Sequence, residues 1–172
     1  MRFTKLGGLA TLVGMMSLAA ATVLAEPTAD KIAARPITYA DLGKLVRSQR
    51  GKVIVVDFWS LDCIPCMREF PHLVELHKKY SAQGLAAMSV SLDNGDDKTV
   101  RAKVDEFLRK REATFTNLIS QGDPDDWYSS LKIGGIPCVF VFDRDNRRVK
   151  KLVGEQVDYK AIEAEVAKLL KK

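Results

Sequence analysis

Two cysteines separated by two residues, Cys63 and Cys66, form the pair whose spacing most clearly predicts chemistry in this chain. They follow an apolar, β-branched stretch at residues 53–56 and open an amphipathic segment, so we expect them at a strand-to-helix junction. At a helix N-terminus, unpaired backbone N–H groups and the positive end of the helix dipole stabilise a thiolate. Because the thiolate is the species that attacks a disulfide, this placement indicates thiol–disulfide chemistry.

The two sulfurs are expected to differ in role. Cys63, at the helix N-terminus, is the expected exposed nucleophile, and Cys66, one turn further in, is the expected buried thiol that resolves a mixed disulfide. The alternatives are an inert disulfide or half of a zinc site. Zinc usually takes two further Cys or His ligands at matching spacing, and only His72, His77 and Cys138 are available, with nothing to pair them. We therefore favour a redox pair.

The segments around the dithiol predict an α/β domain. Strands are expected at residues 52–59, 85–92, 138–142 and 148–153. Helices are expected from a capping Thr38 to about residue 47, and at residues 63–80, 98–111, 124–131 and 159–170. Residues 115–119 fit either a strand or a loop. The order βαβ, then a helix, a β-hairpin and a last helix, predicts a mixed central sheet with helices on both faces.

Composition and the N-terminal pattern limit the classes of protein to which this chain can belong. The chain has 172 residues, 47% of them apolar and 28% charged, as in an ordinary single-domain globular protein. Arg2 and Lys5 precede an uncharged stretch at residues 6–25 that ends in small or compact residues. This pattern predicts a secretory signal peptide at 1–25, a linker at 26–37 and a single domain at 38–172. A retained membrane anchor is the alternative, because about 20 uncharged residues suffice to span a bilayer.

Export bears on the cysteines, because disulfides persist in oxidising compartments. Removal of residues 1–25 takes away two basic residues and lowers the formal net charge from +5 to about +3, which is too small to indicate a nucleic-acid partner. The acidic run at residues 93–97 has the wrong spacing for a calcium loop.

Several motifs together resemble thioredoxin. The Asp-Phe-Trp run at residues 57–59 before the dithiol, and Pro71 five residues after Cys66, are similar to its active-site strand and helix. The run Ile-Gly-Gly-Ile-Pro at residues 133–137, followed by an apolar strand, an acidic turn and Gly154, resembles its cis-proline loop and final hairpin. The resemblance covers about residues 38–170. The exported N-terminus, Glu69 and the inserted helix at 98–111 make the chain more similar to the TlpA/ResA-like thiol–disulfide oxidoreductases.

This resemblance implies a thioredoxin-like fold and a buried acid. Asp57 lies where the family carries a carboxyl beneath the dithiol. Burial raises the pKa of such a carboxyl, which then serves as the base that accepts the proton of Cys66. The alternative is a partly solvated aspartate at the end of the strand.

The resemblance also implies a substrate-binding loop. Pro137 matches the family's cis-proline, and Ile136 offers backbone groups to an extended substrate segment. An ordinary trans turn is the alternative. Trp59, Ile64 and Pro65 complete the expected substrate-binding set, with core packing as the alternative for Trp59. Glu69 fits the family pattern and fits equally well as a helix-surface carboxylate.

Two features bear on the direction of electron flow. Asp62 precedes Cys63, where a carboxylate disfavours the thiolate, and the Ile64-Pro65 pair resembles that of reducing members, without the histidine of oxidising and isomerising relatives. Both features favour a reductant.

Cys138 stands where thioredoxin relatives carry threonine, and strand alternation predicts that its side chain points inward, close to Cys66. It is expected to be a buried inert thiol, or else an alternative disulfide partner or shielded regulatory sulfur.

The expected protein is an exported thiol–disulfide oxidoreductase of the periplasm or cell envelope that reduces disulfides of envelope proteins. The resemblance to this family implies cytochrome c biogenesis as one task of the protein. No cofactor or metal is implied, because the dithiol holds both electrons. The expected partners are disulfide-containing protein substrates and a membrane thiol-transfer electron donor, with no nucleic acid, and the protein is expected to be a monomer. The alternatives are an oxidant or isomerase on the same scaffold, or a non-catalytic thioredoxin-like binding module.

Overall fold

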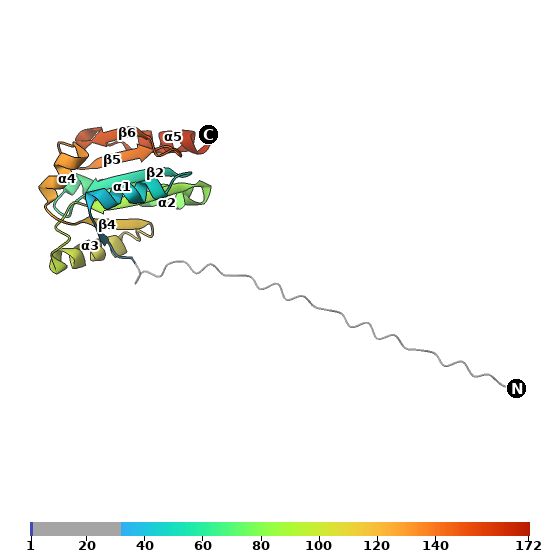
Figure 1. The fold of residues 1–172 in the computed structure, drawn as a ribbon, viewed down its shortest axis with the longest axis horizontal. Helices are drawn as coiled ribbons and strands as arrows, with labels where there is room; N and C mark the ends of the chain where they lie inside the picture. The colour runs from blue at the N-terminus through green and yellow to red at the C-terminus, as the bar shows by residue number, and fades with distance from the viewer. Residues whose placement is uncertain (2–31) are drawn as a thin grey trace.

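A six-stranded mixed sheet forms the centre of the molecule, in a computed structural model that describes residue 1 and residues 32–172. Its strands are β1 (Arg35–Ile37), β2 (Val53–Trp59), β3 (Leu85–Ser91), β4 (Thr116–Ser120), β5 (Cys138–Phe142) and β6 (Arg148–Val153). They lie in the order β1-β4-β3-β2-β5-β6, with the β5–β6 hairpin at one edge (Figure 1). Strand β2 pairs in parallel with β3 and antiparallel with β5, so the predicted mixed sheet is confirmed.

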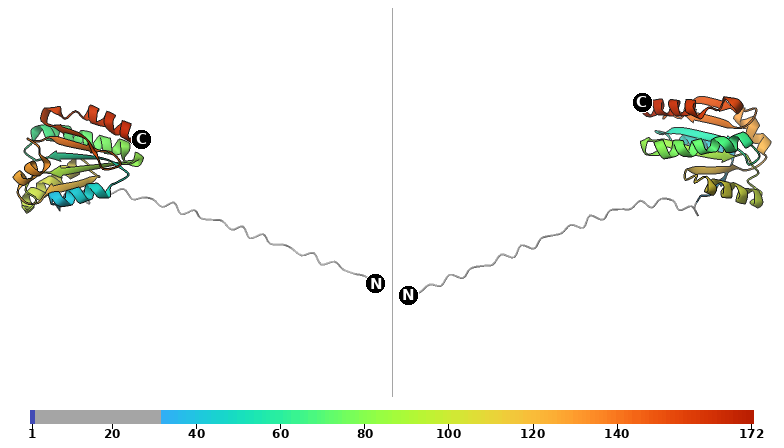
Figure 2. Two further views of the ribbon diagram at one scale, coloured as in Figure 1. Left: turned by 45° about the horizontal axis from the view of Figure 1, so that its top comes forward. Right: turned by 180° about the vertical axis from the view of Figure 1, so that it is seen from behind.

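Five helices cover the two faces of this sheet: α1 (Tyr39–Ser48), α2 (Ile64–Tyr80), α3 (Lys98–Lys110), α4 (Pro124–Leu131) and α5 (Tyr159–Leu170). The core on one face is built with α2, α3 and α5, and the core on the other face with α1 and α4. Seen from behind, α2 and α5 lie in front of the sheet (Figure 2, right), whereas α1 lies in front in Figure 1. Within residues 32–172, no helix combines the length and apolar character needed to cross a membrane.

Strand β2 carries the residues that lead to the dithiol, and all seven of its residues are buried. Its side chains alternate between the two cores. Val55 and Trp59 pack on the face covered by α2, α3 and α5, whereas Val56 and Phe58 pack on the face covered by α1 and α4. Asp57 therefore belongs, by its position between Val56 and Phe58, to the face beneath α2.

One strand was not expected from the sequence, and for a second segment the sequence left both a strand and a loop open. Residues 35–37, placed in the linker by sequence, form β1, which pairs in parallel with β4 in the register Arg35↔Leu118. Three residues are too few to show a period of two, so only the partner strand reveals β1. Residues 115–119 were expected to form either a strand or a loop, and the structure has the strand β4 at Thr116–Ser120, between β3 and β1. The predicted signal peptide and residues 26–31 of the predicted linker lie outside the described residues.

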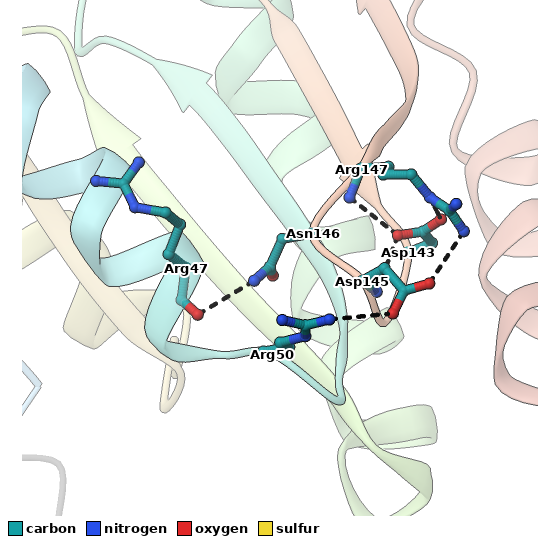
Figure 3. A network of polar contacts seen from close by, with 6 residues as sticks. All are labelled: Arg47, Arg50, Asp143, Asp145, Asn146 and Arg147. Atoms are coloured by element: carbon teal, nitrogen blue, oxygen red, sulfur yellow. Dashed lines mark hydrogen bonds and ion pairs between the residues drawn. The ribbon is translucent and has the colours of Figure 1, made fainter.

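The turn between β5 and β6 is tied to the segment that precedes β2 (Figure 3). The side chain of Asn146, whose φ is +62°, donates a hydrogen bond to the Arg47 carbonyl at 3.1 Å. Within the turn, Arg147 pairs with Asp143 at 2.9 Å. Because β5 runs antiparallel to β2, these contacts gather at the start of β2, and the opposite end of the sheet carries the dithiol.

Candidate active site

The two cysteines of the motif are joined by a disulfide at the start of α2. Cys63 is the N-cap residue, and its Sγ accepts a hydrogen bond from the backbone N–H of Cys66 at 3.2 Å. Cys63 is partly exposed, whereas Cys66 is only 2% exposed. The Cys63 sulfur is therefore the accessible one, and it lies where helix N–H groups and the helix dipole stabilise a thiolate after reduction.

A carboxylate from a neighbouring strand holds the loop in front of the dithiol. Oδ2 of Asp93, just beyond β3, accepts hydrogen bonds from the backbone N–H of Leu61 at 3.0 Å and from the Ser91 hydroxyl at 2.6 Å. The sequence showed only that the acidic run starting at Asp93 is no calcium loop. The role of Asp93 depends on the parallel pairing of β2 with β3, which brings the ends of both strands to one edge of the sheet.

The predicted substrate loop faces the same end of the sheet. The Ile136–Pro137 peptide bond is cis, as the resemblance implies. The Pro137 carbonyl accepts a hydrogen bond from the N–H of Gly154 at 2.7 Å, and Gly154 has a φ of +60°, which glycine adopts without steric penalty. A groove here is lined by residues from α2, this loop and the segment after β6, among them Pro65, Glu69, Ile136, Pro137, Gly154 and Val157.

Four of the five residues predicted to bind substrate lie at this surface. Pro65, Ile136 and Pro137 line the groove, and Ile64 is 78% exposed beside Cys63. Trp59 differs, since its side chain is 0% exposed and packs against Phe70 and Phe107 with ring centroids 5.1 and 4.7 Å apart. A substrate-contact role for Trp59 is therefore wrong, because helix α3 covers the face of β2 on which Trp59 lies.

Asp57 is a buried carboxyl on the face beneath α2, with 3% exposure. Burial raises the pKa of Asp57 to about 7, and the Glu69 carboxylate adds to the rise. Its Oδ2 accepts a hydrogen bond from the Tyr159 hydroxyl at 2.7 Å. The sequence did not predict this contact, because Tyr159 lies 102 residues from Asp57 along the chain. The available signal was an aromatic residue with a polar tip at the start of a helix.

Cys138 does not lie where strand alternation was expected to place it. It pairs with Phe58 in the β2–β5 register and packs in the core beneath α1 and α4, whereas Cys66 packs in the core on the other face. The expectation that Cys138 points toward Cys66 is therefore wrong. The alternation of side chains along a strand shows which of its residues share a face. Only the assembled sheet shows which of the two faces also carries Cys66.

Cys138 is expected to be unreactive in the folded protein. The thiol is free and 0% exposed, and burial raises its pKa to about 12. After reduction of the full chain, iodoacetamide should modify Cys63 within minutes, while Cys138 should react only after denaturation. Peptide mass mapping before and after unfolding in guanidinium chloride measures both. A Cys138 adduct formed under native conditions, or a disulfide to Cys138 in the oxidised protein, would contradict this expectation.

The residues weighed as zinc ligands do not gather around the dithiol. Cys138 lies on the other face of the sheet, and His77 packs against Phe115 with ring centroids 5.5 Å apart. Among residues 32–172, no three His, Cys, Asp or Glu side chains are grouped so that they could hold a metal ion.

The fold and the site define a thioredoxin-like protein. Residues 51–149 match a family model described as thioredoxin-like. This segment is more than half of the chain, and it includes the Cys63–Cys66 disulfide and the cis Ile136–Pro137 bond. The chain belongs to the thioredoxin-like family.

Named relatives agree with this family. The thiol-disulfide oxidoreductase ResA of a Bacillus cereus strain is 27% identical over 111 residues, which cover 64% of this chain and 60% of that relative. ResA of Geobacillus thermodenitrificans is 32% identical over 104 residues, covering 60% of this chain and 55% of that relative. The chain thus spans no more than about 60% of the length of these two curated relatives.

Solved structures are similar over a larger share of the chain. A crystal structure from Chlorobium tepidum, of a protein assigned as the thiol:disulfide interchange protein DsbE, has a TM-score of 0.59 and 27% identity. The match covers 72% of this chain and 83% of that chain. A solution structure of a thiol:disulfide interchange protein from a Bacteroides species has a TM-score of 0.59 at 21% identity, covers 73% of this chain and 78% of that one, and supports the fold alone.

Proposed function

We propose that this protein is a thiol–disulfide oxidoreductase that uses Cys63 and Cys66 to reduce disulfides in other proteins. The observation that carries the proposal is the disulfide between a partly exposed N-cap cysteine and a buried cysteine one turn further along α2. The relatives named ResA and the structural neighbour assigned as DsbE support the same class of reaction.

The first step is the attack of the Cys63 thiolate on one sulfur of a substrate disulfide. The new bond joins Cys63 to that sulfur, and the second substrate sulfur leaves as a thiolate, which takes up a proton from water. The backbone N–H of Cys66 favours the attacking state, because it already points at the Cys63 sulfur from 3.2 Å. The product is a mixed disulfide between protein and substrate.

The second step releases the substrate. Cys66 gives its proton to the Asp57 carboxylate, and its thiolate attacks the Cys63 sulfur, so that the intramolecular disulfide forms and the bond to the substrate breaks. The departing substrate thiolate is then protonated, leaving the substrate reduced by two electrons and the protein oxidised. Asp57 suits this role because its pKa, raised by burial to about 7, lies near neutral pH.

Substrate docking is proposed at the groove beside the cis-proline loop. Ile64 and Ile136 present apolar side chains near the dithiol, and the Ile136 backbone precedes a proline that has no N–H of its own. An extended segment around the substrate cysteine fits such a loop by strand-like pairing. Disulfide-containing proteins are therefore the proposed substrates.

The proposal also covers the direction of electron transfer, the compartment in which the protein works and the source of its electrons. Asp62 and the Ile64-Pro65 pair favour a reductant, and the N-terminal pattern at residues 1–25 favours export to the periplasm or cell envelope. A reductant in an oxidising compartment needs a supply of electrons, for which a membrane thiol-transfer protein is the proposed donor. Reduction of haem-attachment cysteines during cytochrome c maturation is the proposed task.

The equilibrium reduction potential of the Cys63–Cys66 pair tests the proposal. We expect a value near or below about −270 mV, the range of thioredoxin. The full chain is equilibrated with mixtures of reduced and oxidised dithiothreitol, and the free thiols are counted by alkylation and mass spectrometry. The variant Cys138→Ala is the control, because it removes the third thiol without touching the pair.

The other outcomes have separate meanings. A potential between about −200 and −120 mV would replace the reductant by the oxidant or isomerase alternative. A pair that fails to cycle in any mixture would favour the non-catalytic binding module.

A further inference from the structure

We propose that Tyr159 is a positioning residue for Asp57, the proton acceptor. Its hydroxyl donates a hydrogen bond to Oδ2 of Asp57, and this leaves Oδ1 as the oxygen that takes the proton. This inference rests on the proposed function, because it concerns the proton that leaves Cys66 before the mixed disulfide is resolved. The observations that carry it are the two unequal oxygens of one buried carboxyl.

The two oxygens of Asp57 have different surroundings. Oδ2 accepts the hydrogen bond from Tyr159 at 2.7 Å. Oδ1 is also buried, and no group in residues 32–172 forms a hydrogen bond with it. A buried carboxylate oxygen without a partner is costly when charged, so a proton is most stable on Oδ1. Tyr159 can remain a donor to Oδ2 before and after this protonation.

The position of Tyr159 is fixed from several sides. It is the first residue of α5, directly after the N-cap Asp158, whose carboxylate accepts from the Lys160 N–H at 2.9 Å. The His72 ring from α2 packs beside it, with ring centroids 5.6 Å apart. The chain leading into α5 begins at Gly154, which is bonded to the cis-proline loop. The hydroxyl is thus held toward Asp57 by elements that also form the site.

The charge balance keeps Tyr159 in its donor form. Burial and the nearby Asp57 carboxylate raise the pKa of Tyr159 well above its ordinary value, so the hydroxyl stays protonated at neutral pH. The other titratable groups that interact electrostatically with Asp57 are Glu69 from α2 and Cys138 from β5. Glu69 raises the pKa of Asp57, whereas the hydrogen bond from Tyr159 lowers it. Tyr159 therefore counteracts part of the effect of burial.

The test replaces the hydroxyl and keeps the ring. In oxidised Tyr159→Phe, the titration midpoint of the Asp57 carboxyl carbon, followed by ¹³C NMR, should rise by about one pH unit, because the charged carboxylate loses a hydrogen bond that stabilises it. Tyr80→Phe is the matched control. Its hydroxyl also donates to a carboxylate between α2 and α5, that of Glu163 at 3.1 Å, and its removal should leave the Asp57 midpoint unchanged.

Kinetics and a measurement on the unmodified protein complete the test. The pH at which resolution of the mixed disulfide reaches half its maximal rate should rise with the Asp57 midpoint in Tyr159→Phe, and Tyr159→Phe should add no pH shift in an Asp57→Asn background. In the wild-type protein, the hydroxyl proton of Tyr159 should change its NMR shift with the midpoint of Asp57. This last measurement does not depend on the folding of any variant.

The outcomes separate the inference from the proposed function. An Asp57 midpoint equal in Tyr159→Phe and wild type, or a Tyr159 hydroxyl proton that ignores the Asp57 titration, would overturn the role of Tyr159. If the wild-type dithiol fails to exchange with disulfides, the proposed function falls, whatever the NMR titrations show.

Discussion

Replacing Cys66 with serine is expected to arrest the protein at the mixed disulfide with its substrate. Cys63 still attacks, because it is the partly exposed sulfur at the N-cap of α2. Serine at position 66 cannot displace the substrate, since a hydroxyl does not form a disulfide. The reduced Cys66→Ser variant should therefore open at most one substrate disulfide per molecule and accumulate as a covalent adduct. With insulin as the disulfide-containing probe, non-reducing electrophoresis and intact mass measure the adduct.

Two further variants sharpen this result. Cys63→Ser should form no adduct and show no turnover, because Cys66 is only 2% exposed and cannot reach a protein disulfide. Cys138→Ala should turn over like the wild type, since Cys138 lies in the core on the other face of the sheet. Adduct formation through Cys66 in Cys63→Ser would reverse the assigned roles. Sustained turnover by Cys66→Ser would exclude Cys66 as the resolving thiol.

Replacing Asp57 with asparagine is expected to change how stability depends on pH. Burial raises the pKa of Asp57 from 3.8 to about 7. Between these values the folded protein holds a proton that the unfolded chain has released, so the free energy of unfolding falls as pH rises from about 4 to 7. Asparagine cannot ionise. Relative to the wild type, Asp57→Asn should therefore gain up to about 4 kcal/mol between pH 4 and pH 8.

Urea unfolding of the oxidised proteins at pH 4 and pH 8 measures this difference. Asp126→Asn, at an exposed position of α4, serves as the control and should show no comparable change. In kinetics, Asp57→Asn should slow release of the mixed disulfide by at least about 100-fold at pH 7, the usual contribution of a general base. If the stability difference is the same at both pH values, Asp57 does not titrate near neutrality, and the proposed base fails.

Much of the fold and of the site could be predicted from local pattern. The apolar run in β2, the helical spacing in α2 and the Asp123-Pro124 start of α4 are features of neighbouring residues, and each element appears within a few residues of its predicted bounds. The dithiol and the cis-proline loop came from motifs with fixed spacing. Such features depend on short-range geometry, which is written directly in the order of the residues.

Contacts between distant segments were the part that sequence patterns missed. Trp59 is buried because α3 packs over it, and Cys138 faces away from Cys66 because of the register between β2 and β5. The short strand β1 exists only because β4 offers it an edge. In each case the deciding partner lies far along the chain, where no local period or motif indicates it.

By itself, the sequence located a pair of cysteines at a strand-to-helix junction, an acid two residues before Trp59 and a proline loop in an α/β domain. The tertiary structure decided that Trp59 is covered, which core holds Cys138 and which hydroxyl reaches Asp57. The physical reason is that exposure, burial and hydrogen bonding are properties of the packed molecule. The pKa of Asp57 depends on them, because it is raised by the elements that close over the carboxyl and lowered by a tyrosine 102 residues away.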